Sequence, residues 1–460
     1  MSTQPRTTHG PLSAPRTRNG RTAGRRPAGA VAALVAFGVL AVSACGDDAP
    51  DSSAASTSST AGPTTTAAPG TTAGAASGTF DAATVERFDE LVRQFQDVNQ
   101  TPRALIGVWS PQGTYVSAAG VSDITTNAPM EPDMQFKIAS QTKSFTGNLT
   151  LQLVSEGKIS LDDHISTRIK DVPNGDEITI RQLLNHTSGL ADGFTDLSVQ
   201  ARTPDGCTVE ELLSWESKFP PVAEPGEKWS YSNYGFNLLG RMVELVEGKD
   251  LSTVLTERIT EPLGLTRTFL ATDGSGLTAP FTRGYGFGDL GPTEAPTAAS
   301  DATDIPLSCL WAHGAMVSTL EDMHVWMSSM STLVSPEVWT EATTDPVPFV
   351  FGGNYNGPGL WLNALGFDES GGFYVAEGSF AGYESASMYS PTLDTTISVM
   401  TTKMPSAITP PPMMQALAIA LYGDAVDFGN GLTLDQAMAP NLGPGHDAGP
   451  TTTTATTTNY

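Results

Sequence analysis

Hydrophobic residues recur with two different periods along the chain, and these periods separate an early, a middle and a late part. In the early part, apolar residues at helical spacing run from Val85 to Val98. Two short strand-like runs follow at Leu105–Ser110 and Thr114–Ala119, with a Pro-Gln-Gly turn between them. The early part therefore predicts one helix and one β-hairpin.

The middle part, from Ser140 to about Leu263, is dominated by helical patterns. Capping boxes mark the start of a helix, because two side chains three residues apart satisfy backbone N–H groups that lack partners there. Three such boxes lie within or soon after the middle part: Thr179 with Gln182, Thr208 with Glu211, and Ser318 with Glu321.

The late part returns to strand-like runs and closes with an apolar helix. The runs are Leu360–Gly366, Phe373–Ala376, Tyr383–Ser390 and Thr395–Thr402, and the helix is Met413–Tyr422. Short turns between strands favour antiparallel pairing. We therefore expect an α/β (α+β) fold: an antiparallel sheet flanked by helices and built from both chain ends, with an inserted mostly helical region and the active site in the cleft between them.

The charge of the chain narrows the classes of partner. Its 460 residues carry a formal net charge of -25, whereas a protein that binds nucleic acid needs basic residues against the phosphates. An acidic surface also repels anionic substrates unless a local cation overrides it. The six histidines are scattered, without the spacing of a helical metal site, so we expect no metal and no cofactor.

The N-terminal segment predicts export. Residues 1–44 are arginine-rich, then apolar, and end in small residues before Cys45, which is typical of a signal peptide and resembles a bacterial lipobox. We expect Cys45 to carry lipid and to hold the protein at the membrane on its extracytoplasmic side; an ordinary secretory signal is the alternative. Residues 45–78 predict a flexible Ser/Thr/Ala/Pro tether, 79–425 the folded domain, and 426–460 a low-complexity tail.

Two further cysteines remain once Cys45 is set aside. Cys207 and Cys309 would then form an even pair in an oxidising compartment, where disulfides persist. Sequence alone gives no distance between them, so a disulfide and two separately buried thiols both stay open.

The first candidate for chemistry is the Ser-Gln-Thr-Lys stretch from Ser140 to Lys143. Apolar positions continue it as a helical face, so we expect Ser140 at a helix N-terminus with Lys143 on the same face. A serine hydroxyl needs a neighbouring base, and a lysine can serve only if burial or another cation lowers its pKa. A second Ser-x-x-Lys, Ser155 to Lys158, is interpreted as structural, because Gly157 should end that helix.

The second candidate is Tyr231-Ser232-Asn233, which follows a Pro-Gly turn and precedes a helical pattern. Tyr231 and Asn233 can then project from a loop into a cleft. A tyrosine whose pKa is lowered by cationic neighbours can act as a general base or acid. Taken alone, the motif favours the other interpretation, a core tyrosine beside an Asn helix cap.

Together the two motifs resemble the serine β-lactamase and penicillin-binding superfamily, in the branch of class C β-lactamases, D-alanyl-D-alanine carboxypeptidases and β-lactamase-like esterases. Linking stretches at residues 183–189, 225–240 and 262–265 are similar to that branch, and the resemblance spans about residues 85–422. It implies these roles: acylated nucleophile for Ser140, proton partner for Lys143, general base and later acid for Tyr231, substrate positioning for Asn233. It also implies that His186 is structural, and we interpret His313 and His324 in the same way.

The third motif of the family is altered here. A Lys or His, a small residue and Gly would align with residues 376–378, where the cation has become Ala376 and Gly378 is kept. The resemblance implies weaker binding of a substrate carboxylate, while the N–H of Ser379, with that of Ser140, could still form an oxyanion hole. Lys403 could replace the missing charge, or be a solvated lysine at a strand end.

Three functions follow from these expectations. The first is a serine hydrolase that acts through an acyl-enzyme as a D-alanyl-D-alanine carboxypeptidase on cell-wall peptides. The second is an esterase or amidase for neutral substrates, which needs no carboxylate clamp. The third is a catalytically weakened lipoprotein that binds cell-wall peptides. In each case the expected partner is a small peptide or ester.

Overall fold

The computed structural model describes residues 78–440, apart from residues 102, 194–205, 287–289, 345, 350–354, 359–362, 366–371, 427 and 429–432. The expected signal peptide, Cys45, nearly all of the tether and the end of the tail lie outside the described residues. Within the described part, no helix is both long enough and apolar enough to span a lipid bilayer.

Helices form the first and the last elements of the described chain and most of its middle part. The α-helices of the described residues are α1 (Ala82–Asn99), α2 (Thr142–Ser155), α3 (Ile180–Leu184), α5 (Val209–Glu216), α6 (Asn233–Glu247), α7 (Leu251–Leu255), α8 (Glu261–Leu263), α9 (Leu320–Ser329), α10 (Pro336–Thr344), α11 (Pro410–Tyr422) and α12 (Leu434–Ala437). Short 3-10 turns that matter below are η1 (Ala139–Gln141) and η6 (Trp311–His313).

Strands gather near both ends of the described chain. They are β1 (Arg103–Ser110), β2 (Gly113–Asp123), β3 (Ala128–Pro129), β4 (Phe136–Lys137), β5 (Phe269–Leu270), β6 (Met316–Ser318), β7 (Pro346–Phe349), β8 (Tyr355–Pro358), β9 (Asn363–Leu365), β10 (Phe373–Phe380), β11 (Tyr383–Ser390) and β12 (Thr395–Thr401). The main sheet has the order β3-β2-β1-β12-β11-β10-β9, and every pairing in it is antiparallel.

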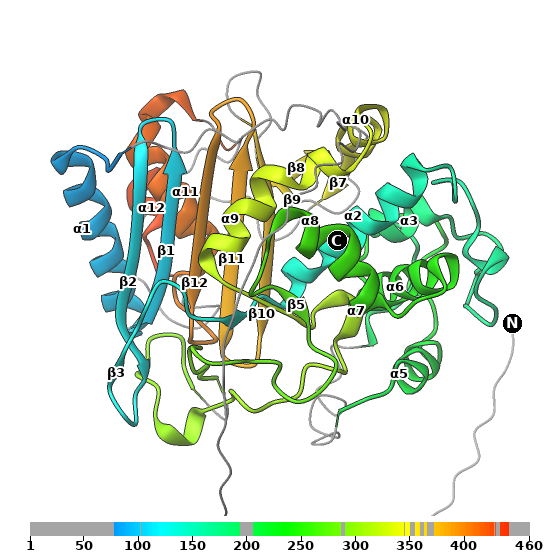
Figure 1. Ribbon diagram of the computed structural model, residues 1–460, viewed down its shortest axis with the longest axis horizontal. Helices are drawn as coiled ribbons and strands as arrows, with labels where there is room; N and C mark the ends of the chain where they lie inside the picture. Colours follow the sequence, from blue (N-terminus) through cyan, green and yellow to red (C-terminus); the bar gives the residue numbers. More distant parts are fainter. Residues whose placement is uncertain are drawn as a thin grey trace, which may run out of the picture. The chain divides into compact units, whose positions relative to one another are not determined.

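The centre of this sheet joins the two ends of the domain. Strand β1 pairs with β12 in a register that sets Ile106 opposite Val399, so cyan and orange strands lie side by side in Figure 1. The predicted fold class, an antiparallel sheet flanked by helices and assembled from both chain ends, is confirmed.

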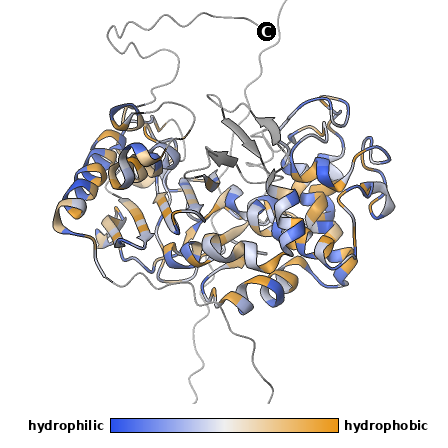
Figure 2. Ribbon diagram, turned by 90° about the horizontal axis from the view of Figure 1, so that it is seen from above, coloured by the Kyte–Doolittle hydropathy of each residue, from blue (hydrophilic) through white to orange (hydrophobic). Residues whose placement is uncertain are grey.

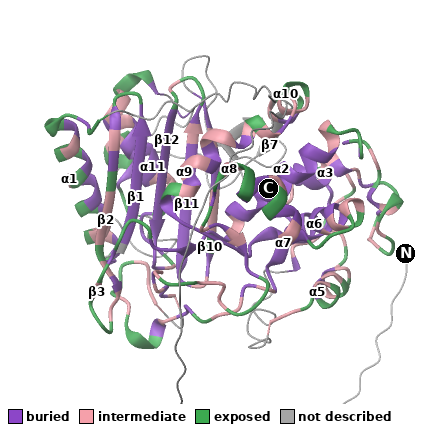
Figure 3. Ribbon diagram, in the orientation of Figure 1, coloured by how far each residue is buried: buried purple, intermediate pink, exposed green. Residues whose placement is uncertain are grey.

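Both faces of the sheet pack against helices in its centre. Because successive side chains of a strand point to opposite faces, each central strand contributes to two hydrophobic clusters. On β1, Ile106 and Val108 join the cluster that packs against α1 and α11, whereas Leu105 and Trp109 join the larger cluster with α2, α6 and α9. The central strands β1, β12 and β11 are accordingly buried along most of their length in Figure 3, whereas β2 is mostly half-buried or exposed. In Figure 2 hydrophobic and hydrophilic stretches alternate along the helices, as expected for elements that bury one face.

Two details of the predicted elements need correction. The capping boxes at Thr179 and Thr208 are confirmed, but α9 is capped by Thr319, which accepts from the backbone N–H of Asp322, because Ser318 is the last residue of β6. The folded unit also continues past the boundary expected at residue 425. Phe428 and the residues at the end of α12 are buried against α11 and the sheet, so apolar contacts order this part of the tail.

Candidate active site

Ser140 lies in η1, the turn between β4 and α2, rather than in the helix itself. Strand β4 pairs with β6, and the backbone N–H of Ile138 donates to the carbonyl of Met316, which anchors the approach to the turn. Ala139 has a φ of 48°, a left-handed conformation that L-residues other than glycine seldom adopt. The turn is thus held in a strained form that leaves the side chain of Ser140 partly exposed while its neighbours are buried.

Lys143 points its amine directly at Ser140. The Nζ atom lies 3.1 Å from Ser140 Oγ, 2.7 Å from Asn233 Oδ1 and 2.8 Å from the carbonyl oxygen of His313. Burial lowers the pKa of Lys143 to about 7, although the carboxylates of Asp192 and Glu216 oppose the shift. Near neutral pH a substantial fraction of the Lys143 side chains therefore carries a neutral amine.

The two carbonyl oxygens around Lys143 decide where that amine can accept a proton. A neutral amine has two N–H groups and one lone pair, and the N–H groups are taken by Asn233 Oδ1 and the His313 carbonyl. The lone pair is then left for the hydroxyl of Ser140. This arrangement suits a general base for a serine nucleophile.

Tyr231 completes the group from the loop before α6. Its hydroxyl lies 2.9 Å from Ser140 Oγ, and Ser232 caps the helix by accepting from the N–H of Gly235. His186 supports this loop: its Nδ1 accepts from the N–H of Ser232, and its ring lies 4.6 Å from the ring of Tyr231. Burial lowers the pKa of His186 to about 3, so His186 stays neutral beside the site.

The protonation state of Tyr231 differs from the expectation. Burial raises the pKa of Tyr231, the hydrogen bond with Ser140 opposes this, and the carboxylates of Asp192 and Glu377 raise it further. A pKa lowered by cationic neighbours is therefore not found for Tyr231, because burial is the largest influence on it. The side chain is a neutral phenol at neutral pH, suited to donate a proton rather than to accept one.

Strand β10 lies directly against the Ser140 turn at Gly378. A Cβ at this position would lie 2.7 Å from Ser140 N and even closer to the carbonyl of Ile138, so only glycine allows the approach. The β10–β11 hairpin turns through Ala381 and Gly382, both with positive φ, which makes Phe380 and Tyr383 a hydrogen-bonded pair.

The register of this hairpin determines where the other N–H groups of β10 point. Alternation along the strand turns the N–H of Ser379 away from β11. Gly378 and Ser379 are thus placed beside Ser140, where two backbone N–H groups could meet an oxyanion. The methyl group of Ala376 is buried in the core and supplies no charge.

Lys403 is neither a replacement charge nor a solvated lysine. Its side chain is fully buried, and its Nζ donates to the carbonyl oxygens of Asn99 and Pro292, each at 2.6 Å. In the same region the Asn99 side chain makes two hydrogen bonds with the backbone of Ile408: its Nδ2 donates to the carbonyl oxygen, and its Oδ1 accepts from the N–H. Lys403 thus fastens the end of α1 to the last strand, and both earlier interpretations are corrected.

Three contributors to the site were not predicted as such from the sequence. Asp192 accepts from Asn233 Nδ2 at 3.1 and 3.3 Å, the His313 carbonyl receives Lys143, and Gln141 Nε2 donates to Ser385 Oγ at 2.7 Å. Each comes from a segment distant in sequence from its partner. No local pattern marks them, except that Gln141 lies inside the Ser-x-x-Lys motif.

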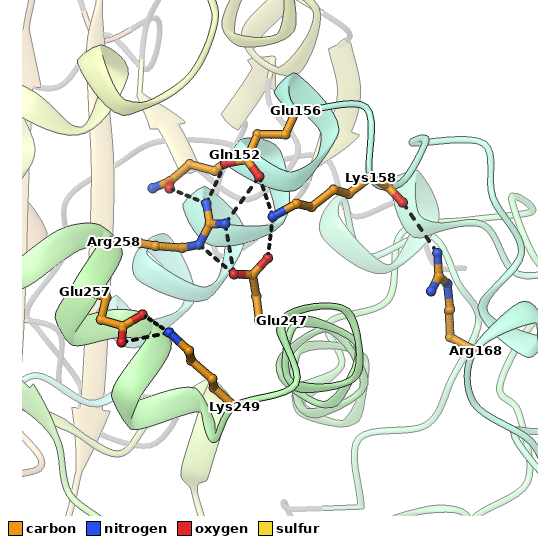
Figure 4. A network of polar contacts seen from close by, with 8 residues as sticks. All are labelled: Gln152, Glu156, Lys158, Arg168, Glu247, Lys249, Glu257 and Arg258. Atoms are coloured by element: carbon orange, nitrogen blue, oxygen red, sulfur yellow. Dashed lines mark hydrogen bonds and ion pairs between the residues drawn. The ribbon is translucent and has the colours of Figure 1, made fainter.

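The lysine of the second Ser-x-x-Lys, Lys158, takes part in a network of ion pairs with other residues, as Figure 4 shows. Gly157 has a φ of 67° beyond the end of α2, and Lys158 binds Glu247 at 2.8 Å within a surface network that includes Glu156 and Arg258. Ser155 Oγ donates to the carbonyl of Leu151 inside the helix. Nothing among these contacts links Ser155 to Lys158.

The remaining cysteines are joined. Cys207 and Cys309 form a disulfide with a Cα–Cα distance of 4.8 Å. Across the described residues, no group of three or more His, Cys, Asp or Glu side chains is arranged to hold a metal ion.

Comparisons with known proteins agree with this geometry. The family model described as Beta-lactamase matches residues 88–419. Among curated proteins, Penicillin-binding protein 4 from Amycolatopsis lactamdurans is 29% identical over 185 residues, which cover 39% of this chain and 46% of that protein. The chain thus spans less than half the length of the curated relatives it matches.

Solved structures match over a longer stretch. A D-stereospecific amidohydrolase from Streptomyces sp. superposes with a TM-score of 0.60 at 25% identity, covering 70% of this chain and 94% of that one. A D-amino acid amidase from Ochrobactrum anthropi gives a TM-score of 0.59 at 26% identity, covering 70% and 90%.

Proposed function

The chain belongs to the beta-lactamase family and is a serine hydrolase of that family, and from this premise we propose that it hydrolyses small D-amino-acid amides, peptides or esters through an acyl-enzyme on Ser140. The observation that carries the proposal is the convergence of three side chains on one point. Lys143 Nζ and Tyr231 Oη lie 3.1 and 2.9 Å from Ser140 Oγ, although the tyrosine is far from the other two in sequence.

The reaction divides the roles between these groups. Lys143 takes the proton of Ser140 while the new bond forms between Oγ and the substrate carbonyl carbon. The N–H groups of Ser140 and Ser379 receive the negative charge that develops on the carbonyl oxygen. The C–N or C–O bond then breaks as Tyr231 gives its proton to the leaving group, and a proton returns to Tyr231 from Lys143. Water hydrolyses the acyl-enzyme by the reverse sequence of proton transfers.

The charges around the site favour substrates that lack a carboxylate at the leaving group. Ala376 stands where the resemblance to the family implies a cation, and the carboxylates of Asp192 and Glu377 act on Tyr231. An anionic leaving group would meet these charges unfavourably. The names of the structural neighbours, a D-stereospecific amidohydrolase and a D-amino acid amidase, support the same substrate class.

A D-alanyl-D-alanine carboxypeptidase acting on cell-wall peptides is the second candidate. The similarity to Penicillin-binding protein 4 favours it, and so does the expectation that residues 1–44 direct export and that Cys45 carries lipid. The disulfide between Cys207 and Cys309 is consistent with an oxidising compartment. Metabolic labelling with a palmitate analogue, with and without Cys45→Ser, tests the anchor.

The test of the catalytic proposal is intact-protein mass spectrometry after incubation with a fluorophosphonate. We expect one adduct that maps to Ser140 and is lost in Ser140→Ala; an adduct that persists in this variant contradicts the proposal. Turnover of D-phenylalanine amide against a D-Ala-D-Ala peptide then separates the two candidates. In Glu377→Gln, removal of the acidic charge should raise turnover of the peptide relative to the amide severalfold.

A further inference from the structure

A chain of buried polar groups continues behind Lys143, on the side away from Ser140. The carbonyl that receives Lys143 belongs to His313, and Nδ1 of the same histidine lies 3.3 Å from Asn237 Oδ1. The amide nitrogen of Asn237 donates to both carboxyl oxygens of Glu216, at 3.1 and 3.0 Å. Because that amide nitrogen is committed to Glu216, the amide oxygen is the acceptor and His313 Nδ1 carries the hydrogen.

Glu216 closes this chain deep inside the protein. It is the last residue of α5, and only 1% of its surface is exposed. Burying a carboxyl group costs free energy that a neutral side chain of similar shape would not cost, and both oxygens of Glu216 accept from one amide nitrogen, that of Asn237. Packing alone therefore does not account for an acid at this position.

The disulfide fastens both ends of the polar chain together. Cys207 lies just before α5, and its N–H donates to Ser308 Oγ at 3.0 Å; Cys309 lies just before η6. The helix that ends in Glu216 and the turn that ends in His313 thus start from one covalent junction. Movement of α5 would be transmitted to the carbonyl that holds Lys143.

The groups that face Glu216 are Asn237 and Tyr234 on α6, Lys143 on α2, and Asp192 on the loop after α3, with His313 beyond Asn237. Burial raises the pKa of Glu216 to about 8 despite the Asn237 hydrogen bond. Below this pH Glu216 is mostly uncharged. Above it, the carboxylate favours the protonated form of Lys143 and so opposes the neutral amine that catalysis needs.

We propose that Glu216 is a positioning residue for the reaction: through Asn237 and His313 it fixes the carbonyl that orients Lys143 toward Ser140. This inference rests on the proposed acyl-enzyme. The wild-type protein must first form the Ser140 adduct, so failure of the proposed function shows itself before any variant of Glu216 is made.

The test is the rate of acylation by a neutral fluorophosphonate, measured from pH 5 to pH 9 in the wild type, Glu216→Gln and the matched control Glu210→Gln. Glu210 is an exposed residue on the same helix. Glutamine at 216 keeps the shape, and its amide oxygen can still accept from Asn237, but it cannot become anionic and it places an NH2 donor where the second carboxyl oxygen accepted from the same nitrogen. We expect about tenfold slower acylation and a midpoint shifted to lower pH by about half a unit, with Glu210→Gln like the wild type.

A second variant, Asn237→Ser, interrupts the same series of hydrogen bonds at its middle residue. It replaces Glu216→Gln in the test if circular dichroism shows that Glu216→Gln is not folded. We expect slower acylation with a displaced midpoint here too. A folded variant of either kind with the wild-type rate and midpoint overturns the proposal. A slower rate with an unmoved midpoint also overturns it, because Glu216 would then act through packing alone.

Discussion

Gly378 on β10 lies against the backbone nitrogen of Ser140, so closely that the hydrogen in place of a side chain is what lets the strand reach the nucleophile turn. Gly378→Ala would place a Cβ 2.7 Å from Ser140 N and push apart the two backbone segments proposed to bind the oxyanion. We expect acylation to slow about 100-fold or more, the effect of losing one oxyanion donor.

Gly157→Ala is the control for this change. Unlike Gly378, Gly157 has a positive φ, and it has no atom near an added Cβ, so alanine there should lower stability by about 1 kcal/mol and leave acylation unchanged. Equal acylation rates in Gly378→Ala and the wild type would contradict the close approach.

Replacing Lys143 with methionine removes the amine and keeps the apolar stem. Because general-base catalysis contributes about 100- to 10,000-fold, we expect a loss in that range, while Lys158→Met on the surface has no effect. In the wild type, the acylation rate should rise as pH rises through about 7, where the buried amine loses its proton. A stopped-flow pH profile measures this, and a flat profile across pH 6–8 would exclude Lys143 as the base.

Tyr231→Phe removes the hydroxyl and keeps the ring against His186. A departing amine needs a proton, whereas nitrophenolate departs without one, so the loss should depend on the leaving group. We expect turnover of D-phenylalanine 4-nitrophenyl ester to fall much less than turnover of the amide. The two kcat/KM values measured side by side provide the test; equal losses would assign Tyr231 another role.

Breaking the disulfide with Cys207→Ser and Cys309→Ser should lower stability by about 2–4 kcal/mol, because the bond closes a loop of roughly a hundred residues. The same change releases the start of α5, so the acylation rate should fall as well. Thermal unfolding and the fluorophosphonate assay measure the two effects; an unchanged melting temperature would show that the bond adds nothing to the folded state.

The sequence predicted the fold well because its main features are local. The alternation at Tyr383–Ser390 and the helical spacing of Val85 to Val98 coincide with β11 and α1. The predicted start of α9 is wrong by one residue because two neighbouring residues, Ser318 and Thr319, can both cap a helix. The pairing of β6 with β4 and β5 includes Ser318 in the strand and leaves Thr319 as the cap.

The site was less accessible to sequence reasoning, since its chemistry depends on contacts between distant segments. Ser140, Lys143 and Tyr231 stood out as motifs, and the structure brings them together. The His313 carbonyl carries no side-chain signal at all. The pKa of Tyr231 rises rather than falls chiefly because the side chain is buried, and Asp192 and Glu377, which no local pattern links to it, raise it further.

Because β1 pairs with β12, the sheet lacks its centre until nearly the whole domain has been synthesised. A nascent chain that ends before Phe373 already contains the serine, the lysine and the tyrosine, but not the strand against which the nucleophile turn is held. Such long-range pairing is slow to form. The growing polypeptide should therefore be inert toward acylating reagents, and reactivity should appear only once translation has delivered the last strands.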